Sequence, residues 1–167
     1  MSAFLGYLWS FTRIFIKSPS GRHRFNVLGA INAVSKELVL VTNTSYITSL
    51  QIGEMLVKIA LRRTTGRPIT IVLDNARYQR CKLVMEKAEE LGIELLFLPP
   101  YSPNLNLIER LWKFVKKDVL YSKYYDNNFE RFKEAIITCL SQTETKHKKA
   151  LDSLLTLKFQ TFSETQY

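Results

Sequence analysis

Two short apolar runs, each closed by residues that stop a strand, constrain the fold of this chain most strongly. The first, ITIVL at 69–73, ends at Asp74, and the second, IELLFL at 93–98, ends at two prolines. A continuous apolar run of this length is typical of a strand that is buried on both faces, as in a parallel sheet. Between them, 79–91 has helical spacing and stops at Gly92. The sequence therefore predicts a β-α-β unit.

The other elements follow from the same two periodicities. Apolar runs at 25–34 and 37–42, joined through Ser35 and Lys36, predict a β-hairpin. Helical spacing predicts a helix after the capping box at 48–51, a helix that begins near Asn106, another from about 129 and a shorter one over 147–157. The order β-β-α-β-α-β-α-α predicts an α/β fold with a mixed sheet flanked by helices. We expect a single domain over 1–167, with C-terminal helices from about 122.

The charge of the chain favours an anionic partner. Lys and Arg total 24 against 15 Asp and Glu, which gives a net charge of +9 at pH 7. Nucleic acid is the usual partner of such an excess, and simple solubility is the ordinary alternative, about as frequent. No acidic residue precedes Glu37, whereas Arg13, Lys17, Arg22 and Arg24 do.

Neither a membrane span nor a disulfide framework is expected. The apolar N-terminus is interrupted by Gly6, Arg13 and Lys17, and no uninterrupted apolar run reaches about 18 residues. The only two cysteines, Cys81 and Cys139, fall in helical patterns without the spacing of a Cys/His metal motif. Their number fits a reducing, cytoplasmic compartment.

Two carboxylates are the strongest candidates for chemistry. Alone, Asp74 reads as a turn residue, and Glu109 reads as a helix cap because Asn106-x-x-Glu109 has the reciprocal capping pattern. Together they say more, since the ends of neighbouring parallel strands meet at one edge of a sheet. Two carboxylates that meet there repel each other unless a cation lies between them, and such oxygen ligands suit Mg²⁺ or Mn²⁺. Paired ions of this kind support phosphodiester chemistry.

Four cationic residues adjoin Glu109. Lys113 and Lys116 lie four and seven positions beyond it, on its own flank of the predicted helix, with Arg110 and Lys117 beside them. An ordinary solvated helix face would have the same pattern. Next to a metal site, the pattern favours contacts with a phosphate backbone.

Two segments resemble the signature blocks of a known family. The signature blocks of DDE transposases of the mariner superfamily, bacterial insertion-sequence branch, resemble two segments of this chain, LDNARYQ (73–79) and LPPYSPNLNLIERLWKFVKK (98–117). In addition, 34 residues lie between Asp74 and Glu109, which matches the separation that this family shows between its second and third acidic ligands. The resemblance extends from about Trp9 to Tyr121. It implies a ribonuclease H-like fold, Mg²⁺ (or Mn²⁺), and cleavage and joining of double-stranded DNA at transposon ends and target. It also implies Asp74 and Glu109 as metal ligands and a bacterial, nucleoid-associated location.

The chain departs from the family pattern at its front. In the family, a first catalytic aspartate lies on the central strand, upstream of a region that resembles FLGYLWSFTRIF. This sequence has no acidic residue before Glu37. Neither Glu37, in the predicted hairpin, nor Glu54, on a predicted helix, is a convincing substitute. We therefore expect the first ligand and the central strand to be absent, and the chain to be weakly active or inactive alone. A histidine of many relatives is replaced by Gln79. Three explanations of the missing ligand remain: the chain is a truncated relic of an insertion sequence, the downstream product of two overlapping frames, or a fragment of a complete enzyme.

Two other functions stay open. The chain could be a non-catalytic DNA-binding or dimerising remnant that modulates an intact transposase, with a second copy or the upstream portion of the same transposase as its protein partner. A different ribonuclease H-like nuclease is the third interpretation, and the specific 98–117 block argues against it. Salt-sensitive DNA binding that survives loss of both carboxylates would favour the remnant.

Overall fold

The structure is a computed structural model that describes residues 11–12, 23–63, 66–100, 102–121, 123, 125 and 128–159. Its elements are strands β1 (Asn26–Ile31), β2 (Leu38–Asn43), β3 (Ile69–Leu73) and β4 (Ile93–Phe97); α-helices α1 (Ser49–Leu61), α2 (Lys82–Glu90), α3 (Leu107–Val115), α4 (Phe129–Ser141) and α5 (Lys148–Leu154); the 3-10 turn η1 (Pro103–Leu105); and the π-helical turn η2 (Lys116–Leu120). The predicted order of strands and helices is confirmed.

The predicted hairpin forms, with a longer turn than expected. β1 and β2 pair antiparallel, with Ile31 opposite Leu38. The turn runs from Asn32 to Glu37 rather than through two residues: the Asn32 N–H donates to the Glu37 carbonyl at 2.9 Å, and Lys36 has a φ of 66°. A non-glycine residue in this left-handed region is uncommon, and it lets the strands reverse within the turn.

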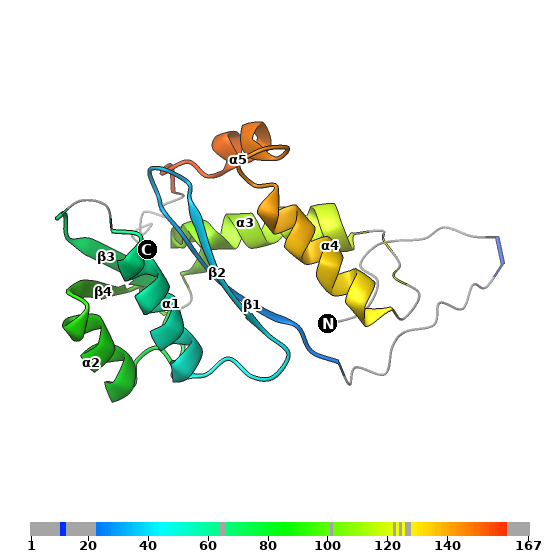
Figure 1. Ribbon diagram of the computed structural model, residues 1–167. Helices are drawn as coiled ribbons and strands as arrows, with labels where there is room; N and C mark the ends of the chain where they lie inside the picture. Colours follow the sequence, from blue (N-terminus) through cyan, green and yellow to red (C-terminus); the bar gives the residue numbers. More distant parts are fainter. Residues whose placement is uncertain are drawn as a thin grey trace, which may run out of the picture.

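The two faces of the hairpin are covered by different helices. Val39 and Val41 of β2 are buried with Met55 of α1, while Leu38 and Leu40, one residue out of phase, pack against the cluster that contains α3. Successive side chains of a strand point to opposite faces, so this alternation follows from the LVLV sequence. The hairpin consequently lies between α1 and α3 (Figure 1).

The β-α-β unit also forms. β3 and β4 pair in parallel, with Ile69 opposite Ile93, and α2 connects them and packs Val84 and Ala88 into a core shared with α1. Gly92 ends α2 with a φ of 61°, the left-handed conformation that glycine adopts most easily. α2 begins at Lys82, three residues later than predicted.

The helical spacing of 79–91 predicts Leu83 on the same inward side as Val84, and this prediction is wrong, because Leu83 is exposed. The later start is the reason for this error. Residues 77–79 form a turn before the helix, and the first helical turn presents Leu83 to solvent while Val84 takes the inward position.

The strands form two small sheets instead of one continuous sheet. β1–β2 is one two-stranded sheet and β3–β4 is another, and no ladder joins them within the described ranges. The suggestion that residues 4–16 pair with the hairpin lies outside the described residues, apart from positions 11–12.

α3, which follows the proline-rich loop, packs together with η2 and the C-terminal helices in one cluster. α3 buries Leu107, Leu111 and Val115, and the chain continues without a break into η2, where Val119 and Leu120 join the same cluster. α4 and α5 complete this cluster with Ile136, Cys139, Leu140, Leu151 and Leu155. In the described part of the chain, no helix is long and apolar enough to cross a membrane.

Candidate active site

Asp74 lies directly after β3, where the chain turns toward α2. Its side chain is exposed, and one carboxylate oxygen accepts from the Ala76 N–H at 3.4 Å. The turn interpretation of Asp74 is therefore correct as far as it goes. This long hydrogen bond engages one oxygen only and leaves most of the acceptor capacity of the carboxylate to another group.

Asn75 joins the ends of the two parallel strands. Its side-chain amide donates to the Leu98 carbonyl, and the Leu98 N–H donates to the Leu73 carbonyl at 2.9 Å, so the pairing of β3 and β4 continues beyond the strands. The other end of the amide, Oδ1, is buried and has no hydrogen-bond partner among the described residues. A buried acceptor without a partner is costly, and it marks a position where a ligand can bind.

Glu109 lies in the first turn of α3. Asn106 caps this helix, because its Oδ1 accepts from the Ile108 N–H at 3.3 Å. The reciprocal half of the predicted capping box does not form: across the described ranges, no hydrogen bond or ion pair engages the Glu109 carboxylate. Asn106 alone therefore caps the helix, and among the residues that the structure describes the partly buried carboxylate of Glu109 has no hydrogen-bond or ion-pair partner.

The structure brings Asp74 and Glu109 to the same cavity. A pocket of about 120 Å³ is lined by Asp74, Asn75, Leu98, Pro99, Pro100, Ser102, Asn106 and Glu109. The β3 end supplies Asp74, and the proline-rich loop after β4 returns the chain so that α3 begins on the other side. The cavity has room for a small hydrated ion, since a water takes about 30 Å³.

The donor set fits a hard divalent cation. Two carboxylates and the unpartnered Asn75 Oδ1 are oxygen ligands of the kind that Mg²⁺ and Mn²⁺ prefer. Asp74 and Glu109 are the residues that would hold the ion. Sequence reasoning missed Asn75, although its position directly after Asp74 at the strand end was a usable signal.

A tyrosine next to the site also escaped the sequence analysis. Burial, and to a smaller extent the negative charge of Asp74, raise the pKa of Tyr78 above its ordinary value. A phenol of ordinary pKa is already neutral at physiological pH, and the raised pKa extends the range of pH over which Tyr78 keeps its O–H. Gln79, the position where relatives carry histidine, is buried, and its Oε1 has no partner among the described residues.

The four predicted DNA-binding cations divide into two groups. Arg110 turns toward the C-terminal segment, where its guanidinium donates to the carbonyls of Thr156 at 2.8 Å and Lys158 at 2.6 Å and stacks over Phe159. Lys113, Lys116 and Lys117 are exposed, and no ion pair within the described ranges involves them. DNA binding by these four residues stays a prediction, and the three lysines are the members whose charges face solvent.

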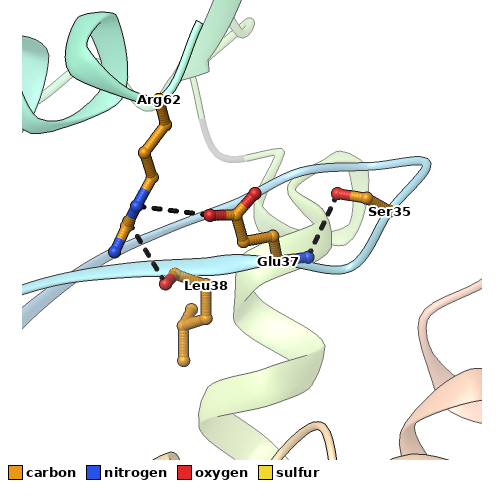
Figure 2. A network of polar contacts seen from close by, with 4 residues as sticks. All are labelled: Ser35, Glu37, Leu38 and Arg62. Carbon is orange, nitrogen blue, oxygen red and sulfur yellow. Dashed lines mark hydrogen bonds and ion pairs between the residues drawn. The ribbon is translucent and has the colours of Figure 1, made fainter. Parts of the chain in front are cut away.

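The two acids considered as substitutes for the missing ligand are used elsewhere. Figure 2 shows Glu37 at the hairpin turn, where its carboxylate pairs with Arg62 at 3.2 Å while Arg62 also donates to the Leu38 carbonyl. Glu54 pairs with Lys58 along α1 at 2.9 Å. Neither carboxylate lines the cavity of Asp74 and Glu109.

A family model described as DDE superfamily endonuclease matches residues 12–149. No significant match to a curated protein was found.

Among solved structures, the fold is similar to a chain of the Mos1 strand transfer complex, with a TM-score of 0.56 and 17% identity, over 93% of this chain and 49% of that one. The catalytic core domain of BIV integrase is also similar, with a TM-score of 0.48 and 17% identity, over 80% of this chain and 96% of that one. The present chain thus spans about half the length of the Mos1 chain, and the similarity to it identifies the fold as ribonuclease H-like. Because the family match extends over well more than half of the sequence, the chain belongs to the DDE superfamily endonucleases.

Proposed function

We propose that this chain is the catalytic-domain portion of a transposase of the mariner superfamily, bacterial insertion-sequence branch, which cleaves and joins DNA at transposon ends. The observation that carries the proposal is the convergence of Asp74 and Glu109 on one small cavity whose other polar group, Asn75 Oδ1, lacks a partner among the described residues. Enzymes of the DDE superfamily use divalent metals, and the oxygen donors fit Mg²⁺ or Mn²⁺.

Each residue of the site has a distinct proposed task. Asp74 and Glu109, which both line the cavity, would hold the ions, and Asn75 fixes the loop that carries Asp74 through its hydrogen bond to Leu98. When bound, a pair of divalent ions activates a water or a 3′-hydroxyl and stabilises the leaving oxygen of the phosphodiester. The lysines of α3 and η2 lie on the flank of Glu109, where they neutralise the backbone of a bound duplex.

We expect the chain alone to be weakly active or inactive. No acidic residue precedes Glu37, and Glu37 itself is paired with Arg62, so this chain brings two carboxylates to the cavity. Two carboxylates hold a metal pair less well than three. Robust Mg²⁺-dependent cleavage by the isolated chain would contradict this expectation.

Metal binding gives a test that does not depend on activity. Mn²⁺ binding, followed by the loss of the free-ion signal in electron paramagnetic resonance, should weaken by at least about tenfold in Asp74→Asn and in Glu109→Gln, and Mg²⁺ should compete. Glu89→Gln, which removes an exposed carboxylate of α2, is the matched control and should leave binding unchanged. Equal Mn²⁺ affinity in all four proteins would refute the assignment.

A non-catalytic DNA-binding remnant is the second candidate, and the exposed Lys113, Lys116 and Lys117 favour it. Neutralising about three phosphates gives a slope of roughly −2.7 in log K against log [salt] for double-stranded DNA. If this slope and the affinity persist in an Asp74→Asn/Glu109→Gln double variant that no longer binds Mn²⁺, DNA binding is separate from the chemistry. A salt-independent affinity would exclude the remnant.

A further inference from the structure

A second cluster of metal-binding side chains lies apart from the carboxylate site. A carboxylate oxygen of Asp118, the sulfur of Cys139 and a ring nitrogen of His147 all lie within 4.8 Å of one another. Asp118 belongs to η2, Cys139 to the last turn of α4, and His147 is the N-cap of α5. Because Asp118 is nine residues beyond Glu109, the two sites are more than about 10 Å apart along the helix.

The surrounding structure holds these side chains in position. Cys139 and His147 are buried, with 4% and 8% of their surfaces exposed, and Asp118 lies at the solvent-accessible side. The His147 ring contacts Phe114 edge-on, at 5.1 Å between ring centroids, and the His147 N–H donates to the Gln142 carbonyl at 3.0 Å. Both the ring and the turn that carries it are therefore fixed before any ion binds.

The bland interpretation is a hydrogen-bonded polar group within the core. Cys139 lies beside Asp118, and burial together with the charge of Asp118 raises the pKa of the Cys139 thiol to about 11. Within the described residues no hydrogen bond engages the ring nitrogens of His147, and neither nitrogen is among the fully buried atoms that lack a partner. An imidazole that lies beside a thiol and a carboxylate with a ring nitrogen available can also serve as a metal ligand.

The mixture of ligand atoms selects the kind of metal. Sulfur, nitrogen and oxygen donors together suit Zn²⁺, whereas Mg²⁺ prefers oxygen alone. Tetrahedral zinc needs ligand atoms about 3.3–3.8 Å apart, so the cluster, whose ligand atoms lie within 4.8 Å of one another, must close by up to about 1.5 Å. Binding displaces the thiol proton to solvent. A thiolate, a carboxylate and a neutral imidazole around Zn²⁺ then sum to zero charge, which suits a partly buried site.

We propose that Asp118, Cys139 and His147 form a zinc site that ties α4 and α5 to the end of α3, with water as the fourth ligand. The three ligands come from three consecutive elements, so one ion joins the π-helical turn to both C-terminal helices. Such an ion stabilises the folded chain because the unfolded chain has no preformed site. The site does not rest on the proposed transposase function.

The sequence supplies an unusually clean test. The chain has two cysteines and two histidines, and the cluster takes one of each. In the full chain without an affinity tag, Cys81→Ala leaves Cys139 as the single thiol, and His23→Ala leaves His147 as the single imidazole, without touching the cluster. In each variant, the thiolate-to-cobalt charge-transfer band should saturate at one equivalent of Co²⁺ bound at this cluster, whatever Co²⁺ the carboxylate site also takes up. Zn²⁺ should displace that Co²⁺, and each variant should gain thermal stability with Zn²⁺.

Removal of the ligands provides the opposite arm. Cys139→Ala should lose the charge-transfer band, and His147→Ala and Asp118→Asn should each weaken Zn²⁺ binding at least about tenfold, with circular dichroism reporting whether each variant is folded. The absence of a thiolate band in Cys81→Ala would overturn the proposal even if the ligand variants fail to fold. Unchanged Zn²⁺ affinity in a folded Cys139→Ala would overturn it as well.

Discussion

The contact between Gly29 and Trp112 allows a prediction of opposite effects at two glycines. A Cβ placed on Gly29, in β1, would lie 2.8 Å from two carbons of the Trp112 indole, in α3. Carbon atoms normally approach to about 3.5–4.0 Å, so the substitution Gly29→Ala forces the strand and the helix apart. A Cβ on Gly53, in the middle of α1, would meet only the Leu83 side chain, at 3.9 Å, which is ordinary contact.

The magnitudes follow from these distances. Overpacking costs about 1–3 kcal/mol, and the lower entropy of the unfolded chain offsets about 0.4–1 kcal/mol of this. Gly29→Ala should therefore lower the free energy of unfolding by about 1–2 kcal/mol. Gly53→Ala should stabilise by about 0.5–1 kcal/mol, because alanine is the better helix former. At roughly 2–4 °C per kcal/mol for a chain of this size, the melting temperature should fall in the first variant and rise in the second.

Trp112 connects this prediction to the site. It lies one helical turn after Glu109, so a displacement of α3 also moves that carboxylate relative to Asp74. Gly29→Ala should therefore lower both the melting temperature and the affinity for Mn²⁺. Gly53→Ala should raise the melting temperature and leave the affinity for Mn²⁺ unchanged. Trp112→Leu added to Gly29→Ala should recover part of the loss as a positive coupling.

The opposite signs make the prediction easy to refute. Gly29→Ala with a melting temperature at or above that of the parent would show that the indole can retreat without cost. A double variant that is simply additive would show that Trp112 is not the group in the way. Either result would contradict the packing of β1 against α3.

Two further predictions concern the C-terminal half. Arg110→Lys removes the planar guanidinium that donates to the carbonyls of Leu154, Thr156 and Lys158. At about 1 kcal/mol for each hydrogen bond, local opening of this segment should increase at least about tenfold in hydrogen exchange, and unchanged protection would refute the role of Arg110. Since the thiolate is the reactive form, a pKa of about 11 should make Cys139 of the metal-free protein alkylate about 100-fold more slowly at pH 8 than a free thiol of pKa 9.0, with the rate rising until the pH passes about 11. Alkylation at the free-thiol rate in the folded, metal-free protein would contradict this.

The elements that sequence reasoning placed correctly are those with a local cause. The Thr48 capping box starts α1 where the pattern indicated, with the Gln51 side chain accepting from the Thr48 N–H at 2.8 Å. The ends of the two parallel strands were equally clear, because each apolar run meets a residue that stops a strand. The convergence of Asp74 and Glu109 followed from this topology, and the catalytic role of the pair stays a prediction.

What escaped the sequence depends on contacts between distant segments. Arg110 donates to backbone carbonyls more than 40 positions away. Every residue has a backbone carbonyl, so the residue types at those positions could not predict these hydrogen bonds. The cluster of Asp118, Cys139 and His147 has no motif spacing, and only the folding of α4 and α5 against η2 brings it together. The length of the hairpin turn was missed because it depends on the left-handed conformation of Lys36, a residue without a preference for it.

The division of the core into separate clusters has a consequence for how the site behaves. Asp74 follows a strand of the cluster built by α1, α2, β3 and β4, whereas Glu109 belongs to the helix at the centre of a second cluster, and a third cluster lies between the hairpin and α1. No strand ladder joins the β3–β4 sheet to the hairpin in the described part of the chain. The two carboxylates are therefore carried by different parts of the core, and their separation depends on how those parts pack together. We expect an ion bound by both carboxylates to link these parts, so metal binding should stabilise the packing of α3 beside the β3–β4 unit.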